Sequence, residues 1–338
     1  MSSPTRIAPA RLRAGSRPAG ARAVRRLVSD WAELGKARLS GLVVATTAVG
    51  FAVAPRGRDE PALAALTVAG TLLAALGANG LNQWAERDRD ARMLRTRGRP
   101  LPAGRLSPCH ALAVSIAWVT AGVALLGATV NALTAGLALL VVLLYTLVYT
   151  PLKTRSTLNT LVGAVCGAIP PLMGWTAATG TIAPRGLVLA GVLFVWQIPH
   201  FLALAWLYRE DYERGGYCML PARDRDGRLS ALMVLLYSLT LVPVALAGHL
   251  AGLAGAVYAV TAIVLGCGIA VLGAMLVADR SRRNARRVFL ASLVYLPLLL
   301  GVMVADRTSP ADPGRTVVEA RLAPSAARPV SATVPARR

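Results

Sequence analysis

Long apolar runs, each close to the length that crosses a bilayer, most constrain what this chain can fold into. An α-helix of about 20 apolar residues spans the hydrocarbon core, and only helices or closed barrels satisfy their backbone groups there. Because 55% of the residues are hydrophobic and only 16% are charged, the chain belongs to the polytopic membrane class. The runs predict an all-α protein with nine transmembrane helices, near 39–55, 61–83, 108–127, 129–150, 157–179, 185–208, 229–250, 253–278 and 288–305.

Both ends of the chain differ in composition from this apolar middle. Residues 1–38 are rich in Ala, Arg, Ser and Pro, and residues 307–338 return to Pro, Ala, Arg and Thr. Neither end has a periodic apolar face, so we expect a disordered basic tail at each end. For the first, an amphipathic organelle-targeting segment is the alternative. The remaining 39–306 is predicted to form one membrane domain.

The basic residues are distributed unevenly between the predicted loops. A net charge of +21 is typical of nucleic-acid binding, but the placement of the charges excludes that class here. Of the 37 Lys and Arg, 28 lie in the first tail and in alternate loops, and three lie in the other loops. This bias predicts a cytoplasmic N-terminus, with the loops 84–107, 151–156, 209–228 and 279–287 on the same side.

A short polar segment follows the second apolar run at once. Asn82, Glu86 and Asp90 are spaced by four, so they share an arc of about 80° on one helix face. Oxygen-bearing side chains are the ligands that Mg²⁺ prefers, and Arg95 and Arg99 just downstream can pair with phosphate oxygens. The alternative is an ordinary solvated loop, but polar residues at a span end are functional by default. The segment therefore predicts a magnesium–diphosphate site.

A second polar element follows the fourth apolar run. Tyr149 and Lys153 are four residues apart and can reach the same point at a helix end. Lys153 could hold a phosphate, while the π face of Tyr149 could stabilise a developing cation. An interfacial Tyr with a snorkelling Lys is the alternative, and the pair by itself, without the first polar segment, favours that alternative.

A third polar element lies in and after the sixth apolar run. His200 follows Pro199, a residue that frees backbone carbonyls within a helix. His200 could be a metal or haem-iron ligand, a general base or a hydrogen-bonded core histidine. Asp211 ends the same segment on the metal side and is a candidate carboxylate for a second metal site.

Three runs resemble the protohaem IX farnesyltransferases, or haem O synthases, of the UbiA-type intramembrane prenyltransferases. They are NQWAERDRDARMLRTRGRPLPAGRLSP, YTPLKTRSTLNTLVGAVCGAIPPLMGW and WQIPHFLALAWLYREDYERGGYCMLP. The likeness extends over about residues 38–305 in order and leaves out the two tails. It implies nine helices around a central cavity, open to the cytoplasm and laterally to lipid.

The resemblance also implies an activity. Farnesyl diphosphate would donate its farnesyl group to the vinyl group of haem b with addition of water, giving haem O and diphosphate on the route to haem A. Mg²⁺ would be the cofactor, and a haem A synthase in the cell membrane is suggested as a partner.

The resemblance gives the candidate residues roles in this reaction. Asn82, Glu86 and Asp90 match the first metal motif, Asp211 the second, Tyr149 and Lys153 the Tyr-x-x-x-Lys element, Arg95 and Arg99 the diphosphate contacts, and His200 a residue associated with haem. An Asp-x-x-x-Asp second motif would place an acid at position 207, where this chain has Leu207.

Two other functions fit parts of the pattern. Another intramembrane prenyltransferase could act on a quinone precursor or chlorophyllide, although the Arg-Thr-x-x-Arg-Pro-Leu and Pro-His-Phe runs favour haem. A transporter or channel would use the polar segments as a gate. The carboxylates cluster at one membrane face rather than at the midplane, which argues against transport.

Overall fold

The structure, a computed structural model, describes residues 19–55 and 59–308, with side chains from Val24 onward. Within these residues it is helical and has no strand, which confirms the predicted all-α class. The helices are α1 (Ala19–Leu34), α2 (Ala37–Val53), α3 (Pro61–Asp90), α4 (Pro108–Thr129), α5 (Ala132–Leu143), η1 (Leu144–Tyr149), α6 (Thr150–Leu152), α7 (Asn159–Thr179), α8 (Pro184–Leu207), α9 (Arg209–Arg214), α10 (Leu220–Arg223), α11 (Arg228–Leu250), α12 (Ala256–Ala278) and α13 (Arg282–Ala305).

Eight of these segments are long and apolar enough to cross a membrane. They are α3, α4, the continuous stretch from α5 to α6, α7, α8, α11, α12 and α13. A ninth is counted only if α1 and α2 form one span, and these two helices meet at a bend of 55°. The chain is therefore a multi-pass membrane protein, while the number nine stays a prediction.

The N-terminal segment departs from the expected tail. Disorder was predicted over 1–38, but residues from Ala19 onward form α1. The end of α1 is anchored because Leu34 packs in an apolar cluster with Leu106 and Ala111, and Asp30 pairs with Arg105 at 2.8 Å. Tertiary contacts of this kind are not visible in local composition. Residues 1–18 and 309–338 of the two predicted tails lie outside the described residues.

Glycines let α2 and α7 approach closely. A side chain on Gly50 would collide with the carbonyl oxygen of Pro171, and one on Gly174 would collide with that of Thr47. Because lipid provides no hydrophobic effect between helices, close packing at small residues is one of the interactions that hold such helices together. It fixes α2 beside the helices that carry the polar segments, since α2 also packs against α3 and α7 against α8.

Large apolar side chains point outward along the last three spans. A protein in water would bury this surface, whereas lipid solvates it. The exposed residues include Leu229, Leu232, Leu236 and Leu239 of α11, Val257, Val260, Val264 and Val271 of α12, and Leu290, Leu293, Val294 and Leu298 of α13.

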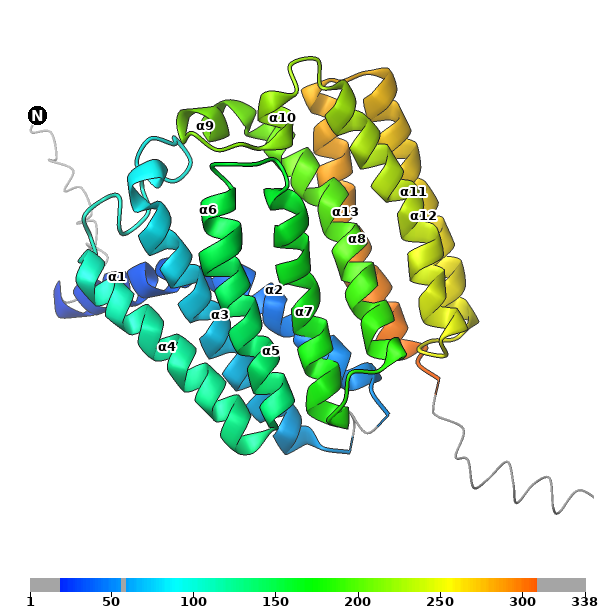
Figure 1. Cartoon of the computed structure of the whole chain (residues 1–338), viewed down its shortest axis with the longest axis horizontal. Coiled ribbons are helices and arrows are strands. Elements are labelled where there is room, and N and C mark those ends of the chain that lie inside the picture. Colours follow the sequence, from blue (N-terminus) through cyan, green and yellow to red (C-terminus); the bar gives the residue numbers. More distant parts are fainter. Residues whose placement is uncertain (1–18, 56–58, 309–338) are drawn as a thin grey trace, which may run out of the picture. The chain divides into compact units, whose positions relative to one another are not determined.

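The predicted same-side loops meet at one end of the bundle, which we call the basic end. In Figure 1 the loop after α3 lies at the same end as α9 and α10. The backbone N–H of Leu94 donates to Asp211 at 2.8 Å, and that of Cys218 donates to the carbonyl of Lys153 at 2.6 Å. The polar segments are therefore assembled in one place, as their sequence positions require.

Candidate functional site

The predicted oxygen ligands lie in the last turns of α3. Asn82, Glu86 and Asp90 are 0%, 5% and 2% exposed, so none of them is a solvated loop residue. A buried carboxylate is costly unless it is paired or binds a cation. The contacts of these three side chains therefore indicate what the site can hold.

Lys36 contacts the first of these ligands from the joint between α1 and α2. Its Nζ donates to Oδ1 of Asn82 at 2.6 Å, and Nδ2 of Asn82 donates to Thr150 at 2.9 Å. Lys36 has φ 46° and ψ 55°, and among the described residues it is the one non-glycine with positive φ. Such strained backbone clusters at functional sites. Sequence reasoning missed Lys36. The one sequence feature that could have drawn attention to it is the Gly-Lys pair just before the first predicted span.

Lys153 makes the corresponding contact with the second ligand. Its Nζ lies 2.7 Å from Oε1 of Glu86, and both side chains are largely buried. Burial opposes the ammonium charge, but Glu86 and nearby tyrosines outweigh it and raise the pKa of Lys153 above its ordinary value. The sequence could not show that this lysine faces α3.

Tyr149 lies beside Lys153, so the structure brings the predicted pair together. The Lys153 Nζ is 4.8 Å from the centroid of the Tyr149 ring. Tyr149 ends η1, a π-helical stretch, and stacks on Tyr145 with ring centroids 5.2 Å apart. Π-helical segments within α-helices occur frequently at functional sites. Here the π-helical stretch carries two stacked aromatic rings, of which that of Tyr149 lies beside the Lys153 cation.

Tyr217, on the loop after α9, is a second residue that sequence reasoning missed. Its ring centroid lies 5.4 Å from Lys153 Nζ, and the Arg89 guanidinium carbon is 6.0 Å from the same centroid. The hydroxyl is buried without a hydrogen-bond partner among the described residues. A buried unpaired hydroxyl is costly, so it indicates a polar group to be bound. Burial raises the pKa of Tyr217, which keeps the hydroxyl a donor.

The two predicted phosphate-binding arginines separate in the structure. Arg99 folds back onto α3 and its Nη1 lies 2.6 Å from Oδ2 of Asp90. Arg95 instead points toward α9, where its guanidinium carbon lies 5.1 Å from the centroid of Tyr208 and 5.7 Å from that of Tyr212. Only Arg99 therefore contacts the α3 ligands directly.

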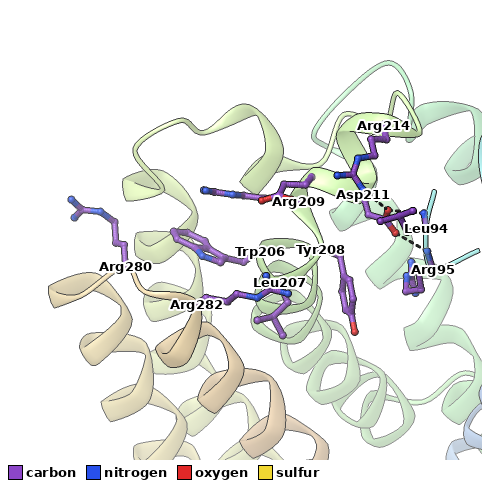
Figure 2. Close-up of a pocket in the computed structure, with 11 residues that line it drawn as sticks. Leu94, Arg95, Trp206, Leu207, Tyr208, Arg209, Asp211, Arg214, Arg280 and Arg282 are labelled. Carbon is purple, nitrogen blue, oxygen red and sulfur yellow. Dashed lines mark hydrogen bonds and ion pairs between the residues drawn. The ribbon is translucent and has the colours of Figure 1, made fainter. Parts of the chain in front are cut away.

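Asp211 does not join the other predicted metal ligands. Its Oδ1 accepts from the backbone N–H of Leu94 at 2.8 Å, and its Oδ2 accepts from that of Arg95 at 3.1 Å. Figure 2 shows these contacts, with Arg214 on the same carboxylate at 3.7 Å. Because both oxygens are directed at consecutive amides, Asp211 ties α9 to the loop after α3. The acidic spacing of the sequence gives no indication of this pairing.

His200 lies between α8 and α13, away from these contacts. Its ring stacks on Trp196 at 5.0 Å, and Nδ1 lies 2.8 Å from Oγ of Ser292. The Ser292 hydroxyl donates its one proton to the carbonyl of Phe289, so Nδ1 of His200 is the donor of the pair. Nε2 then carries the lone pair. A histidine that ligates a metal is oriented in this way by its other nitrogen.

The residues on α3 fit Mg²⁺ bound together with a phosphate. Glu86 Oε2 and Asp90 Oδ1 accept no hydrogen bond from the described residues, so one oxygen of each carboxylate is available. No group of three His, Cys, Asp or Glu side chains in the described ranges forms a complete metal cage. Mg²⁺ usually needs only one or two carboxylates, with substrate phosphates completing its shell. Lys36, Lys153 and Arg99 supply compensating positive charge.

Comparison with known proteins identifies the family to which the chain belongs. The model of the UbiA prenyltransferase family matches residues 43–296. The protoheme IX farnesyltransferase of Anaeromyxobacter dehalogenans is 46% identical over 280 residues, which cover 83% of this chain and 94% of that protein. The human mitochondrial protoheme IX farnesyltransferase is 44% identical over 273 residues, covering 81% of this chain and 61% of that protein.

Solved structures share the fold at low sequence identity. A digeranylgeranylglyceryl phosphate synthase superposes with a TM-score of 0.70 at 14% identity, covering 82% of this chain and 98% of its own. A UbiA homologue from Archaeoglobus fulgidus, bound to DMAPP and Mg²⁺, gives 0.59 at 16% identity, covering 81% and 99%.

Proposed function

The chain belongs to the UbiA prenyltransferase family, and from that premise we propose that it transfers a farnesyl group from farnesyl diphosphate to a vinyl group of haem b. Addition of water would complete the product, haem O, with diphosphate released. The named activity of the relatives at 44% and 46% identity supports this choice of acceptor. It is also the choice that the three sequence runs favour.

One observation carries the proposal. Three buried oxygen ligands on α3 are each contacted by a cation from a different segment: Asn82 by Lys36, Glu86 by Lys153 and Asp90 by Arg99. A site that mixes carboxylates and cations in this way suits a metal-bound diphosphate better than either charge alone. A transport path would instead require polar residues near the midplane.

The side chains of the site would promote departure of the leaving group. As the allylic C–O bond breaks, its electron pair leaves with the diphosphate, and Lys36, Lys153 and Arg99 stabilise the added charge. The Tyr217 hydroxyl, which has no partner among the described residues, would donate a hydrogen bond to the same group. Asn82, Glu86 and Asp90 would hold Mg²⁺, which supplies electrostatic neutralisation of the diphosphate when bound.

The farnesyl cation then needs protection from stray water. The ring of Tyr149, stacked on that of Tyr145, presents a π face beside Lys153, and apolar helix walls would exclude solvent. The π electrons of the haem vinyl group form the new C–C bond. Water captures the resulting cation next to the macrocycle and loses a proton, which leaves a hydroxyethylfarnesyl chain.

The location of the reaction follows from the charge bias. We place the basic end in the cytoplasm and the protein in the cell membrane, with haem b held through His200. Nε2 of His200 is available for iron because Nδ1 is committed to Ser292. A haem A synthase would be the partner that consumes haem O.

The experiment is a transfer assay on membranes that contain the full chain. Haem b and labelled farnesyl diphosphate are incubated with Mg²⁺, or with a chelator, and the haem is analysed by mass. We expect a haem heavier by one farnesyl group and one hydroxyl, formed only with Mg²⁺. Transfer to a quinone precursor but not to haem b would overturn the choice of acceptor.

A further inference from the structure

A cationic cavity, distinct from the α3 site, lies at the basic end beside the loop that follows α3. It encloses about 350 Å³ and is lined by the loop after α3, the segment from the end of α8 through α9, and the start of α13. Figure 2 shows its side chains converging from these three parts of the chain. A cavity of this size accommodates part of a small-molecule ligand.

Arginines dominate the lining. Five line the cavity, against two acids, Glu210 and Asp211. The carboxylate of Asp211 accepts hydrogen bonds from two backbone amides, which hold it in place, and the lining still carries more positive than negative groups. The arginines are Arg95, Arg209, Arg214, Arg280 and Arg282.

Several of these guanidinium groups have no anionic partner. Arg209, Arg280 and Arg282 form no ion pair with any described residue, and Arg214 reaches Asp211 only at 3.7 Å. Guanidinium groups present forked donors that match carboxylate and phosphate oxygens. Unpaired guanidinium groups reach this cavity both from the segment after α8 and from the start of α13. The cavity is therefore suited to one oxyanion, or to two oxyanions on one molecule.

The remaining wall of the cavity is aromatic and apolar. Trp206 is 7% exposed and is held against Gly227, where an added side chain would collide with the indole. In Figure 2 the indole lies between the side chains of Arg209 and Arg282. Arginines beside a fixed, partly apolar wall suit a ligand that combines an apolar body with negatively charged groups at one edge.

The cavity is separate from the α3 site but coupled to it. Arg95 lines the cavity, whereas Arg99, four residues on, contacts Asp90 of the α3 site. Asp211 lines the cavity too and holds the backbone of Leu94 and Arg95. A ligand in the cavity therefore lies against the loop that also carries Arg99 of the α3 site.

We propose that this arginine cavity is a carboxylate subsite for the acceptor, in which Arg209 and Arg282 bind the propionate groups of a tetrapyrrole. The inference rests on the proposed function, because haem b carries two carboxylates at one edge of a flat ring. An anionic lipid headgroup offers the same oxyanion chemistry. The position beside the α3 loop favours the acceptor.

The test compares haem b with its dimethyl ester, which lacks the negative charges. The full chain is placed in nanodiscs of neutral phosphatidylcholine, and both ligands are titrated by absorbance. Arg209→Gln/Arg282→Gln is compared with Arg225→Gln/Arg283→Gln, which removes the same charge from exposed positions outside the cavity. Ester binding reports that each variant is folded.

We expect the wild type and the control variant to prefer haem b over its ester by about tenfold, the scale of charge-assisted hydrogen bonds at a partly solvated site. The cavity variant should lose this preference and bind the ester normally. KM for haem b should rise, while KM for farnesyl diphosphate stays unchanged. If the cavity variant keeps the preference, the inference is overturned.

Two further arms separate the remaining outcomes. In a separate preparation whose nanodiscs contain phosphatidylglycerol, the bound phosphatidylglycerol is counted by native mass spectrometry. A loss in the cavity variant with an unchanged acid-to-ester preference would assign the cavity to lipid and overturn the proposal. Farnesyl transfer to haem b is measured on the wild type. If the wild type transfers farnesyl to haem b but the cavity variant keeps the preference for haem b over its ester, only the subsite is rejected. If the wild type transfers no farnesyl group to haem b, the proposed function itself is rejected.

Discussion

Lys36 and Asn82 are 46 positions apart, and the lysine Nζ donates to the asparagine Oδ1 at 2.6 Å. The contact joins the bend between α1 and α2 to the first ligand position of α3. The strained φ of Lys36 is maintained because α1 and α2 are both anchored to α3. This geometry makes Lys36 a candidate contact of the diphosphate. From its sequence position alone, Lys36 would be taken for an ordinary loop residue.

We expect Lys36→Met to raise KM for farnesyl diphosphate by about tenfold or more, because one charge-assisted contact to the leaving group is lost. Methionine keeps most of the apolar stem. Arg38→Met, at an exposed position two residues on, should behave as wild type. Steady-state transfer kinetics on both variants provide the measurement. Equal behaviour of the two would exclude Lys36 from the site.

We expect Glu86→Gln and Asp90→Asn to lower kcat/KM by at least about a hundredfold, since each removes a charge that faces the developing transition state. The protein should remain in the membrane. Asp88→Asn is the matched control, because its side chain lies on the same turn but is 79% exposed. Near-normal turnover of both site variants would show that the site has been misplaced.

Asp211 can be distinguished from a metal ligand by the Mg²⁺ dependence. We expect Asp211→Ala to raise KM for farnesyl diphosphate by about tenfold, because the loop after α3 loses two hydrogen bonds to its backbone. The half-saturating Mg²⁺ concentration should not change, and Asp211→Asn should be intermediate. Glu213→Ala, at an exposed position, serves as the control. A large shift in the Mg²⁺ requirement would instead make Asp211 a ligand.

His200 is tested by paired titrations on one purified variant. We expect His200→Ala to weaken haem b binding and to change the haem absorbance spectrum, because Nε2 is lost. Farnesyl diphosphate should bind normally, since its proposed site does not contact α13. Ser292→Ala, which frees Nδ1, should weaken haem binding less. Equal losses for both ligands, or none, would reject a haem-specific role.

The orientation of the basic end can be measured by cysteine labelling on a background without native cysteines. Single substitutions at Arg92, Arg155, Arg225 and Arg283 should react with an impermeant reagent only from the cytoplasm, because positive loops are retained there. Ile182, 48% exposed at the opposite end of α8, should react only from outside. Labelling of Arg92→Cys from outside would reverse the topology and move the site with it.

Much of the fold could be predicted because its determinants are local. The length of an apolar run sets a membrane span, and five predicted spans lie within three residues of α4, α7, α8, α11 and α12. Helix α3 continues seven residues beyond its predicted end, and α13 begins six residues before its predicted start, because the charged ends of both helices lie outside the apolar runs. The bend at Lys36 was not predictable, since α2 alone has 17 residues and its packing against α3 and α7 places it. The helical part of the predicted N-terminal tail has the same explanation.

The sequence by itself determined the membrane class, the all-helical architecture and the shared face of Asn82, Glu86 and Asp90, because run length and helical period act within one segment. Only the tertiary structure decided which cations meet these oxygens. In the structure Lys36 and Tyr217 join the α3 site, and Arg99 lies there as predicted. Arg95 and Asp211 contact other residues instead. The physical reason is that a side chain's partner across helices depends on how those helices pack, and spacing along one segment carries no information about that packing.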